Sequence, residues 1–360
     1  MSKISITYDP KTQEAIDLLS GMIEIQSFSK EEDEVANFVA SFFKEKGLSP
    51  KRSGNNLWLK SKHWDQNKPT ILFNSHIDTV KPASSYTLDP FKSQVMEGKL
   101  YGLGSNDAGG PLVCLIQAFL HYQDQEDLPY NLVMAATAEE EISGANGVAS
   151  ILSELGRIDL GIVGEPTLMD MAVAEKGLVV LDCEAKGVSG HAAREEGENA
   201  IYKALKEIEK LNNFQFEKES AYLGPIKKTV TLINAGTQHN VVPDSCKFVV
   251  DVRTTDAYTN AETVQIIDDL MDASVTPRSI RLNSSGLSQD HPIVKRGEVL
   301  GMKKYGSPTL SDQALMPFDT IKIGPGDSAR SHTADEYIGI DEIEAGIKGY
   351  IDLLDGLYIN

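Results

Sequence analysis

The sequence predicts an α/β protein whose main domain is interrupted by a smaller α+β domain. Its 360 residues are more than one ordinary hydrophobic core holds, so two domains are expected. Helical and strand patterns alternate in the first and last parts of the chain, which is typical of a sheet with helices on both faces. Between residues 177 and 283 the order becomes strand, helix, two strands, helix and strand, as in a split-βαβ sandwich. We therefore expect residues 1–176 and 284–360 to form one discontinuous domain around residues 177–283.

The elements of the first part follow from apolar spacing. Residues 10–25 and 31–47 carry apolar side chains at helical spacing, and Gly47 ends the second helix. A further helix is expected over residues 110–122. Short apolar runs predict buried strands, and they lie at residues 70–73, 131–136 and 160–163.

The middle part has a different rhythm. Strands are expected at residues 178–185, 228–235, 246–253 and near 279–282, with helices over residues 198–211 and 260–271. The first rhythm then resumes and ends in an amphipathic helix over residues 340–357. This order places the small domain as an insertion in the larger one.

The composition excludes several classes of partner. The chain is 41% hydrophobic and 24% charged, the balance of a packed globular protein. Its 53 acidic and 34 basic residues give a net charge of −19, which a nucleic-acid backbone or an anionic membrane would repel. No apolar run approaches the roughly 20 residues of a membrane span, and the first residues lack a signal-peptide pattern. With scattered cysteines (Cys114, Cys183 and Cys246), these features predict a cytoplasmic protein.

The first segment with chemical potential follows the predicted strand at residues 70–73. His76 and Asp78 are two residues apart, so on extended backbone their side chains point to the same side. A metal-bound imidazole needs a partner for its second ring nitrogen, and Asp78 could be that partner for His76. Two solvated polar residues at a strand end are the alternative interpretation.

The second segment is a glycine-rich loop that opens into the helix at residues 110–122. It carries Asp107, which stands where a dinucleotide-binding fingerprint would have its third glycine. A carboxylate in such a loop can bridge two cations, because each of its oxygens can bind one of them. The loop therefore favours a metal ligand over a dinucleotide site.

The third segment has three adjacent glutamates, Glu139, Glu140 and Glu141, directly after a predicted buried strand. Adjacent carboxylates repel one another unless cations or separate orientations offset the repulsion. A solvated acidic turn is the alternative, although the apolar flanks argue against a free surface loop.

Two more segments complete the set. Glu165 follows another predicted strand, and His332 lies far along the chain. Histidine and carboxylate ligands without cysteine fit zinc, cobalt or manganese used in hydrolysis, and fit a structural zinc poorly. Two ions sharing a carboxylate lower the pKa of a bridging water and polarise a carbonyl, and a free carboxylate must then accept the proton of that water.

The motifs together resemble a known family, the co-catalytic zinc aminoacylases and carboxypeptidases, and within it the branch of acetylornithine deacetylase and succinyl-diaminopimelate desuccinylase. The resemblance runs from about residue 10 to the C-terminus. Its motifs keep the family order: S-H-I-D-T-V, G-L-G-S-N-D-A-G-G, T-A-E-E-E, V-G-E-P-T, G-H-A-A, H-N-V-V-P-D, D-V-R and S-H-T-A-D-E-Y.

This resemblance implies a zinc-exopeptidase-like catalytic domain with an inserted ferredoxin-like lid and dimerisation domain. It implies a cis peptide bond after Asp107 and makes Glu140 the general acid/base, with two zinc ions (cobalt or manganese as substitutes) as cofactors. The implied ligands are His76, Asp107 and Glu165 for one metal, and Asp107, Glu141 and His332 for the other.

The resemblance also implies residues that act on the substrate. His191 would stabilise the oxyanion in the active site of a partner subunit, which implies a homodimer. Asn240 and Arg253 would bind the substrate carboxylate, and Lys176 could reach the acyl or the side-chain end of the substrate. Ser311 survives from a Gly-Gly-Thr-Ser-Asp stretch near the substrate, whose glycines and threonine are replaced in this sequence.

The expected function is hydrolysis of an N-acyl-L-amino acid, with N-acetylornithine of arginine biosynthesis as the favoured substrate. Succinylated ornithine, succinyl-diaminopimelate, N-acetylcitrulline and a carrier-protein-linked lysine remain open, as does a dipeptidase or aminotripeptidase. A non-catalytic scaffold is disfavoured because it would have no reason to keep Glu140.

Overall fold

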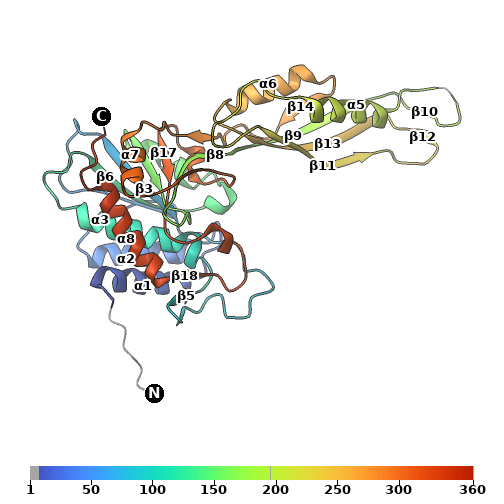
Figure 1. Ribbon diagram of the computed structural model, residues 1–360. Coiled ribbons are helices and arrows are strands. Elements are labelled where there is room, and N and C mark those ends of the chain that lie inside the picture. Colours follow the sequence, from blue (N-terminus) through green and yellow to red (C-terminus); the bar gives the residue numbers. More distant parts are fainter. Residues whose placement is uncertain (1–7, 195, 360) are drawn as a thin grey trace. The chain divides into compact units, whose positions relative to one another are not determined.

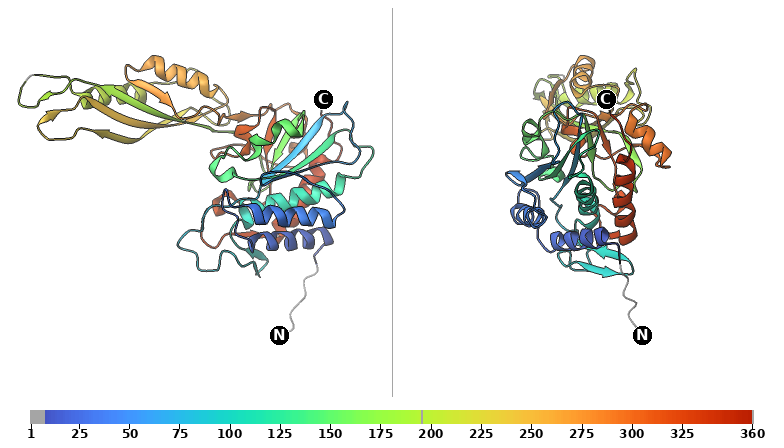
Figure 2. Two further views of the ribbon diagram at one scale, coloured as in Figure 1. Left: turned by 180° about the vertical axis from the view of Figure 1, so that it is seen from behind. Right: turned by 90° about the vertical axis from the view of Figure 1, so that its left-hand side faces the viewer.

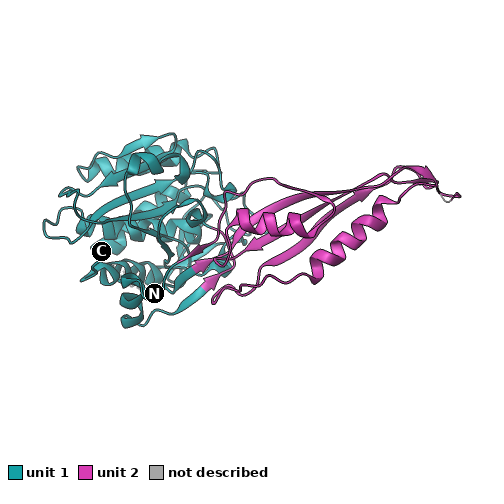
Figure 3. Cartoon of the chain, turned by 90° about the horizontal axis from the view of Figure 1, so that it is seen from above, with its two compact units in different colours: residues 1–173, 287–305, 311–360 teal, residues 174–286, 306–310 magenta. Residues whose placement is uncertain are grey.

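The computed structural model describes residues 8–194 and 196–359. The chain divides into two compact units (Figure 3): unit 1 holds residues 1–173, 287–305 and 311–360, and unit 2 holds residues 174–286 and 306–310. The segment 306–310, expected in the main domain, thus belongs to unit 2. One reason is local pairing, since the Lys176 N–H donates a hydrogen bond to the Ser307 carbonyl at 3.1 Å.

The main sheet of unit 1 has the strand order β1-β2-β6-β3-β7-β17-β8. Figure 1 labels four of these strands, β6, β3, β17 and β8. Neighbouring strands among β6, β3, β7 and β17 are parallel, whereas β1, β2 and β8 join antiparallel. Every residue of β3 and β6 is buried, as expected where a sheet is covered on both faces. The strands are β1 (Lys51–Ser53), β2 (Asn56–Lys60), β3 (Thr70–His76), β6 (Asn131–Thr137), β7 (Leu160–Val163), β8 (Met171–Glu175) and β17 (Thr320–Lys322).

Helices cover one face of this sheet. Helix α3 packs on β3 and β6 and against α8, and α1 packs on α3, α8 and α2. Figure 2 shows α1 and α2 lying side by side. The helices of unit 1 are α1 (Pro10–Ile23), α2 (Asp33–Glu45), α3 (Gly110–Tyr122), α4 (Leu152–Leu155), α7 (Pro292–Val299) and α8 (Ile340–Leu354).

The other face is covered by the segment around α4. Side chains of this face, such as Leu72 and Val133, pack with Val148, Ile151 and Leu155 in one buried apolar cluster. The expected α/β sheet between two layers is therefore confirmed. The predicted helix over residues 110–122 coincides with α3, and the last helix ends three residues earlier than expected.

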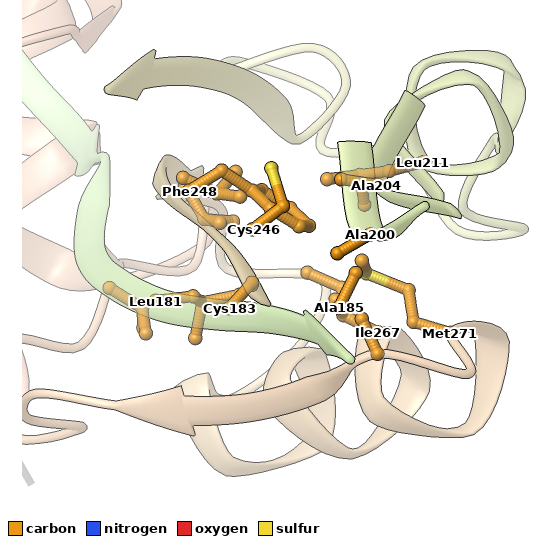
Figure 4. Close-up of a cluster of buried hydrophobic side chains, with 14 of the residues drawn as sticks. Leu181, Cys183, Ala185, Ala200, Ala204, Leu211, Cys246, Phe248, Ile267 and Met271 are labelled. Atoms are coloured by element: carbon orange, nitrogen blue, oxygen red, sulfur yellow. The ribbon is translucent and has the colours of Figure 1, made fainter. Parts of the chain in front are cut away.

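Unit 2 contains an antiparallel sheet of order β11-β13-β9-β14, with α5 and α6 packed on it. Its apolar core, drawn in Figure 4, joins both helices to the inner sides of the strands. The elements are β9 (Gly177–Lys186), α5 (Ala200–Asn213), β11 (Lys227–Ala235), β13 (Ser245–Thr254), α6 (Asn260–Leu270) and β14 (Ser274–Pro277).

The chain order of these elements is the predicted one, but the last strand was misplaced. It lies at Ser274–Pro277 rather than near residues 279–282. Val275 faces Cys183 in the register, which puts this β-branched side chain into the core.

Smaller ladders complete the structure. Strands β18 (Tyr337–Gly339), β5 (Lys99–Tyr101) and β4 (Gln94–Met96) form one, and β10 (Gly190–His191) pairs with β12 (Val241–Val242) in unit 2. Strands β15 (Ser285–Gly286) and β16 (Lys304–Ser307) pair with β8. Within the described residues, none of the helices combines the length and apolar character needed to span a membrane.

Candidate metal centre

The ends of three parallel strands bring chemically active side chains to one edge of the main sheet. His76 is the last residue of β3, and Glu165 comes two residues after β7 ends. Glu140 and Glu141 begin a short 3-10 turn that follows β6. Because β3 pairs in parallel with both β6 and β7, the carboxyl ends of these strands meet.

Asp107 lies between two histidines. Its Oδ1 is 3.4 Å from His76 Nε2, and its Oδ2 is 3.6 Å from His332 Nε2. Asp107 stands in the turn before α3, and its peptide bond to Ala108 is cis, as the resemblance implies. The two oxygens of one carboxylate thus face different imidazoles.

Two groups of potential ligands share Asp107 among the described residues. In each group the ligand atoms lie within 4.8 Å of one another. His76 Nε2 lies 3.8 Å from Glu165 Oε1, and His332 Nε2 lies 3.0 Å from Glu141 Oε2. All five ligands expected from the sequence lie in these groups, which are His76–Asp107–Glu165 and Asp107–Glu141–His332.

The protonation of His76 follows from its second nitrogen. Nδ1 lies 2.8 Å from the backbone carbonyl of Asp78 and 3.5 Å from the carboxylate. A carbonyl only accepts, so Nδ1 carries a proton. Burial opposes a second proton, but the contacts of the ring with Asp107 and Asp78 raise the pKa of His76 well above its usual value, so in the absence of metal Nε2 also carries a proton, which faces Asp107. The carbonyl and the carboxylate of Asp78 thus both lie at Nδ1, and the carbonyl makes the shorter contact.

The Asp78 carboxylate has other partners. It accepts the backbone N–H groups of Glu140 at 3.1 Å and Glu141 at 3.2 Å, and the Ser29 hydroxyl at 2.7 Å. Burial opposes its charge, but contact with His76 and these hydrogen bonds hold the pKa of Asp78 below its usual range. Asp78 therefore fixes the backbone of the glutamate turn to the end of β3.

The three adjacent glutamates separate into different environments. Glu139 adopts left-handed backbone (φ 55°), and its carboxylate accepts the N–H and the side-chain amide of Asn146 at 3.2 and 2.8 Å. Its own N–H donates to buried Glu32 at 3.2 Å. Glu139 is thus held in a structural contact, while Glu141 faces His332.

The cluster carries excess negative charge. Burial foremost, and then neighbouring carboxylates, raise the pKa of Glu140 and of Glu165 well above the usual range, although His76 opposes the shift. The hydrogen bond to Glu141 foremost raises the pKa of His332 to about 9. The raised pKa values of these carboxyl and imidazole groups show that bound protons offset the negative charge of the cluster, and metal cations could offset it in the same way. The nitrogen and oxygen donors fit divalent metal ions.

The predicted substrate residues of unit 2 have their own contacts. His191 is exposed, and its Nδ1 accepts the Ala193 N–H at 3.1 Å, so neutral His191 carries its proton on Nε2. The fork of Arg253 binds both oxygens of Asp251, at 2.8 and 3.1 Å. The Asn240 carbonyl accepts the Ala192 N–H at 3.0 Å.

Two further predicted residues have local structural positions. Lys176 stands between β8 and β9 in unit 2. Ser311 is 5% exposed, and its hydroxyl accepts the Gln313 N–H at the start of a 3-10 turn, Asp312–Leu315. This contact gives Ser311 a capping role.

Two buried carboxylates beside the cluster were not among the predicted site residues, although Asp312 survives with Ser311 in the stretch expected near the substrate. Asp312 accepts hydrogen bonds from Asn74 at 2.7 Å and Thr137 at 3.0 Å, side chains of β3 and β6. Glu336 accepts three backbone N–H groups of the loop that carries Asp107. Its place four residues after His332, in one motif, was the available signal.

Comparison with known proteins agrees with this geometry. A family model described as peptidase family M20/M25/M40 matches residues 72–356. Acetylornithine deacetylase of Proteus mirabilis (strain HI4320) is 31% identical over 300 residues, covering 76% of each chain. Succinyl-diaminopimelate desuccinylase 2 of Ruegeria sp. (strain TM1040) is 23% identical over 387 residues, covering 96% of this chain and 95% of the relative.

Among solved structures, the YXEP protein of Bacillus subtilis, described as a dinuclear metal-binding peptidase from the M20 family, has the same fold. Its TM-score is 0.72 at 15% identity, covering 96% of this chain and 97% of that one. Since the family model spans most of the sequence, the chain belongs to peptidase family M20/M25/M40.

Proposed function

We propose that this metallohydrolase cleaves the amide bond of an N-acyl-L-amino acid, with N-acetylornithine as the favoured substrate and arginine biosynthesis as its setting. The observation that carries the proposal is the placement of the two Asp107 oxygens, 3.4 and 3.6 Å from the nitrogens of two histidines. A carboxylate shared in this way suits a pair of cations. The deacetylase and desuccinylase relatives support an acyl amino acid as substrate.

The proposed cofactors are two zinc ions, with cobalt or manganese as substitutes. One ion would be held by His76, Asp107 and Glu165, and the other by Asp107, Glu141 and His332. When bound, such ions polarise an amide carbonyl and lower the pKa of a water molecule between them. The Asp78 carbonyl accepts the Nδ1 proton of His76, which leaves Nε2 as the nitrogen that would bind the ion.

Glu140 is the proposed general acid/base. Its backbone is fixed by Asp78, and its carboxyl group stands outside both ligand groups. Burial and the neighbouring carboxylates raise the pKa of Glu140, which suits a group that accepts a proton and later donates it. Glu140 would accept the proton of the attacking water and pass it to the leaving amine.

Substrate recognition is proposed for residues of unit 2. Arg253 and Asn240 would bind the substrate carboxylate, and this carboxylate must compete with Asp251 for the Arg253 fork. His191 would donate its Nε2–H to the developing oxyanion. On the family resemblance, Lys176 would reach the acyl or the side-chain end of the substrate, and Ser311 of unit 1 would lie near the substrate.

A homodimer through unit 2 is part of the proposal. Strand β11 lies at the edge of its sheet and exposes Leu232 (56%) and Ile233 (50%). Helix α5, packed beside it, exposes Tyr202 and Leu205. An edge strand flanked by apolar side chains is a surface that a second copy can bury.

A substrate panel tests the proposal. Purified enzyme loaded with zinc would be assayed against N-acetyl and N-succinyl derivatives of ornithine, citrulline, lysine and diaminopimelate, and against unblocked dipeptides and tripeptides. Release of ornithine from N-acetylornithine with the highest kcat/KM is expected. Preference for a succinyl substrate would move the assignment to a desuccinylase, and cleavage of unblocked peptides alone would make the enzyme a peptidase. Two bound zinc ions without turnover would favour a binding scaffold.

A further inference from the structure

We infer that Glu336 is a positioning residue that fixes the Asp107 carboxylate and couples it to the segment carrying His332. The inference rests on the proposed role of Asp107 as the shared ligand of two cations. Glu336 is 2% exposed and belongs to neither group of potential ligands among the described residues. Its role must therefore follow from the groups to which it is hydrogen-bonded.

Glu336 binds the loop that carries Asp107 at several points. Its Oε1 accepts the N–H groups of Asn106 at 2.8 Å and Asp107 at 2.9 Å, and its Oε2 accepts the N–H of Gly104 at 3.0 Å. Its backbone carbonyl also accepts the N–H of Gly102 at 3.0 Å. One residue thus determines the course of the backbone through the Asp107 position.

A second contact ties the same two segments together. Asn106 accepts the Asp327 N–H at 3.0 Å and donates to the Asp327 carbonyl at 3.1 Å. The segment from Asp327 to Glu336 is therefore bound to the Asp107 loop at both of its ends. His332 lies between these ends in left-handed backbone (φ 58°), a conformation that non-glycine residues rarely adopt.

This double attachment sets a distance that the proposed site needs. His332 Nε2 and Asp107 Oδ2 lie 3.6 Å apart, although the two residues come from different segments. If the loop and the segment moved independently, binding a shared cation would have to fix both of them, and the conformational entropy lost would weaken metal binding. A ligand pair held in advance binds metal more tightly.

A carboxylate suits these contacts better than an amide does. Three N–H groups converge on Glu336, and two carboxylate oxygens can accept all of them. Glutamine would turn its amino group toward at least one donor, and alanine would leave all three buried N–H groups without this partner. The expected order of effects is therefore alanine larger than glutamine.

The test compares metal binding by the full chain and its variants after metal removal. Zinc affinity and stoichiometry would be measured by competition with a chelator, and the visible absorption of the Co²⁺-loaded protein would report ligand geometry. For Glu336→Ala we expect affinity for at least one ion to fall by about 10–100-fold with an altered Co²⁺ spectrum. Glu336→Gln, which keeps the side-chain shape, should show a smaller loss in the same direction.

The neighbouring Asp335 provides a matched control. It accepts the Thr87 N–H and the Leu88 N–H at 2.9 Å and the Thr87 hydroxyl at 2.6 Å. Asp335 thus lies in the same segment as Glu336 and also binds three donors, but its donors belong to residues 87–88, which carry no proposed ligand. Asp335→Ala should lower the melting temperature without changing zinc affinity or the Co²⁺ spectrum. Glu207→Gln in unit 2 matches the burial of Glu336 and should behave likewise.

The outcomes separate this inference from the proposed function. Unaltered zinc affinity and Co²⁺ spectrum in a folded Glu336→Gln and Glu336→Ala would overturn the positioning role, provided that Asp107→Asn loses metal. A parental chain that binds no pair of metal ions, or an Asp107→Asn variant that binds both normally, would instead overturn the proposed metal centre. If Glu336→Ala does not fold, Glu336→Gln decides alone.

Discussion

The backbone N–H of Glu140 donates to the Asp78 carboxylate at 3.1 Å, across 62 positions of sequence. The contact joins the end of β3 to the turn after β6, and the Glu141 N–H adds a second bond to the same carboxylate. Asp78 therefore controls where the proposed base and one proposed ligand stand. Asp78 also contacts His76 Nδ1, through its backbone carbonyl at 2.8 Å and its carboxylate at 3.5 Å.

Replacing Asp78 by asparagine should therefore lower turnover, because it disturbs the turn that carries Glu140 and Glu141 in addition to the contact with His76. The amide can accept at one position only, and its amino group faces an N–H donor of the turn. We expect kcat to fall by about 10–100-fold, the range for residues that orient metal ligands. Ser29→Ala removes only the hydroxyl bond to Asp78 and should cost clearly less in steady-state kinetics. Equal losses in both variants would contradict this account.

The division of labour among the adjacent glutamates gives a second prediction. Glu140→Gln should keep both metals and lose turnover by about 100- to 10,000-fold, the usual contribution of a general acid/base. Glu139→Gln is the matched control, since its carboxylate is occupied by Asn146. It should retain most activity and lose some thermal stability. Metal content is measured by elemental analysis and turnover by kcat. If Glu139→Gln lost turnover and Glu140→Gln kept it, Glu139 would be the general base instead.

The sequence predicts much of this site because the ends of buried strands can be located from their apolar runs. The buried apolar runs of β3 and β7 end close to His76 and Glu165, and parallel strands bring their carboxyl ends together. Asp107 is readable from the glycine loop before α3. Local pattern and one rule of sheet architecture make these residues candidates, and the family resemblance implies their division into two ligand sets.

Other features depend on contacts between distant segments. Nothing in the run of three glutamates shows that Glu139 turns toward Asn146 while Glu32 receives its N–H. Nor does the sequence show that the Asp78 carbonyl comes closer to His76 than the Asp78 carboxylate does, because this depends on the backbone path after β3. The place of β14 was missed because Val275 enters the core by its register with β9.

A third prediction concerns His191. Its proposed donor, Nε2–H, would act on the oxyanion, so His191→Ala should lower kcat by about 100- to 1,000-fold, as for other oxyanion donors. Metal content should stay unchanged, since His191 is an exposed residue of unit 2 and outside both ligand groups. Mixing His191→Ala with Glu140→Gln should restore part of the activity if the histidine serves the partner subunit. No recovery in verified mixed dimers would show that it acts within its own chain.

The last prediction is a pH dependence of metal binding. The hydrogen bond to Glu141 raises the pKa of His332 to about 9, so below that pH the metal-free histidine carries a proton. A metal ion must displace this proton, and the protons that Glu140 and Glu165 hold by burial are lost in the same direction. Zinc affinity should therefore rise as the pH increases toward 9, and binding at pH 7 should release protons. Titration calorimetry in two buffers of different ionisation enthalpy measures this release. Glu141→Gln removes the foremost cause of the His332 shift and should reduce the release at pH 8, whereas Glu139→Gln should leave it unchanged. Binding at pH 7 without proton release would contradict the charge distribution described for the cluster.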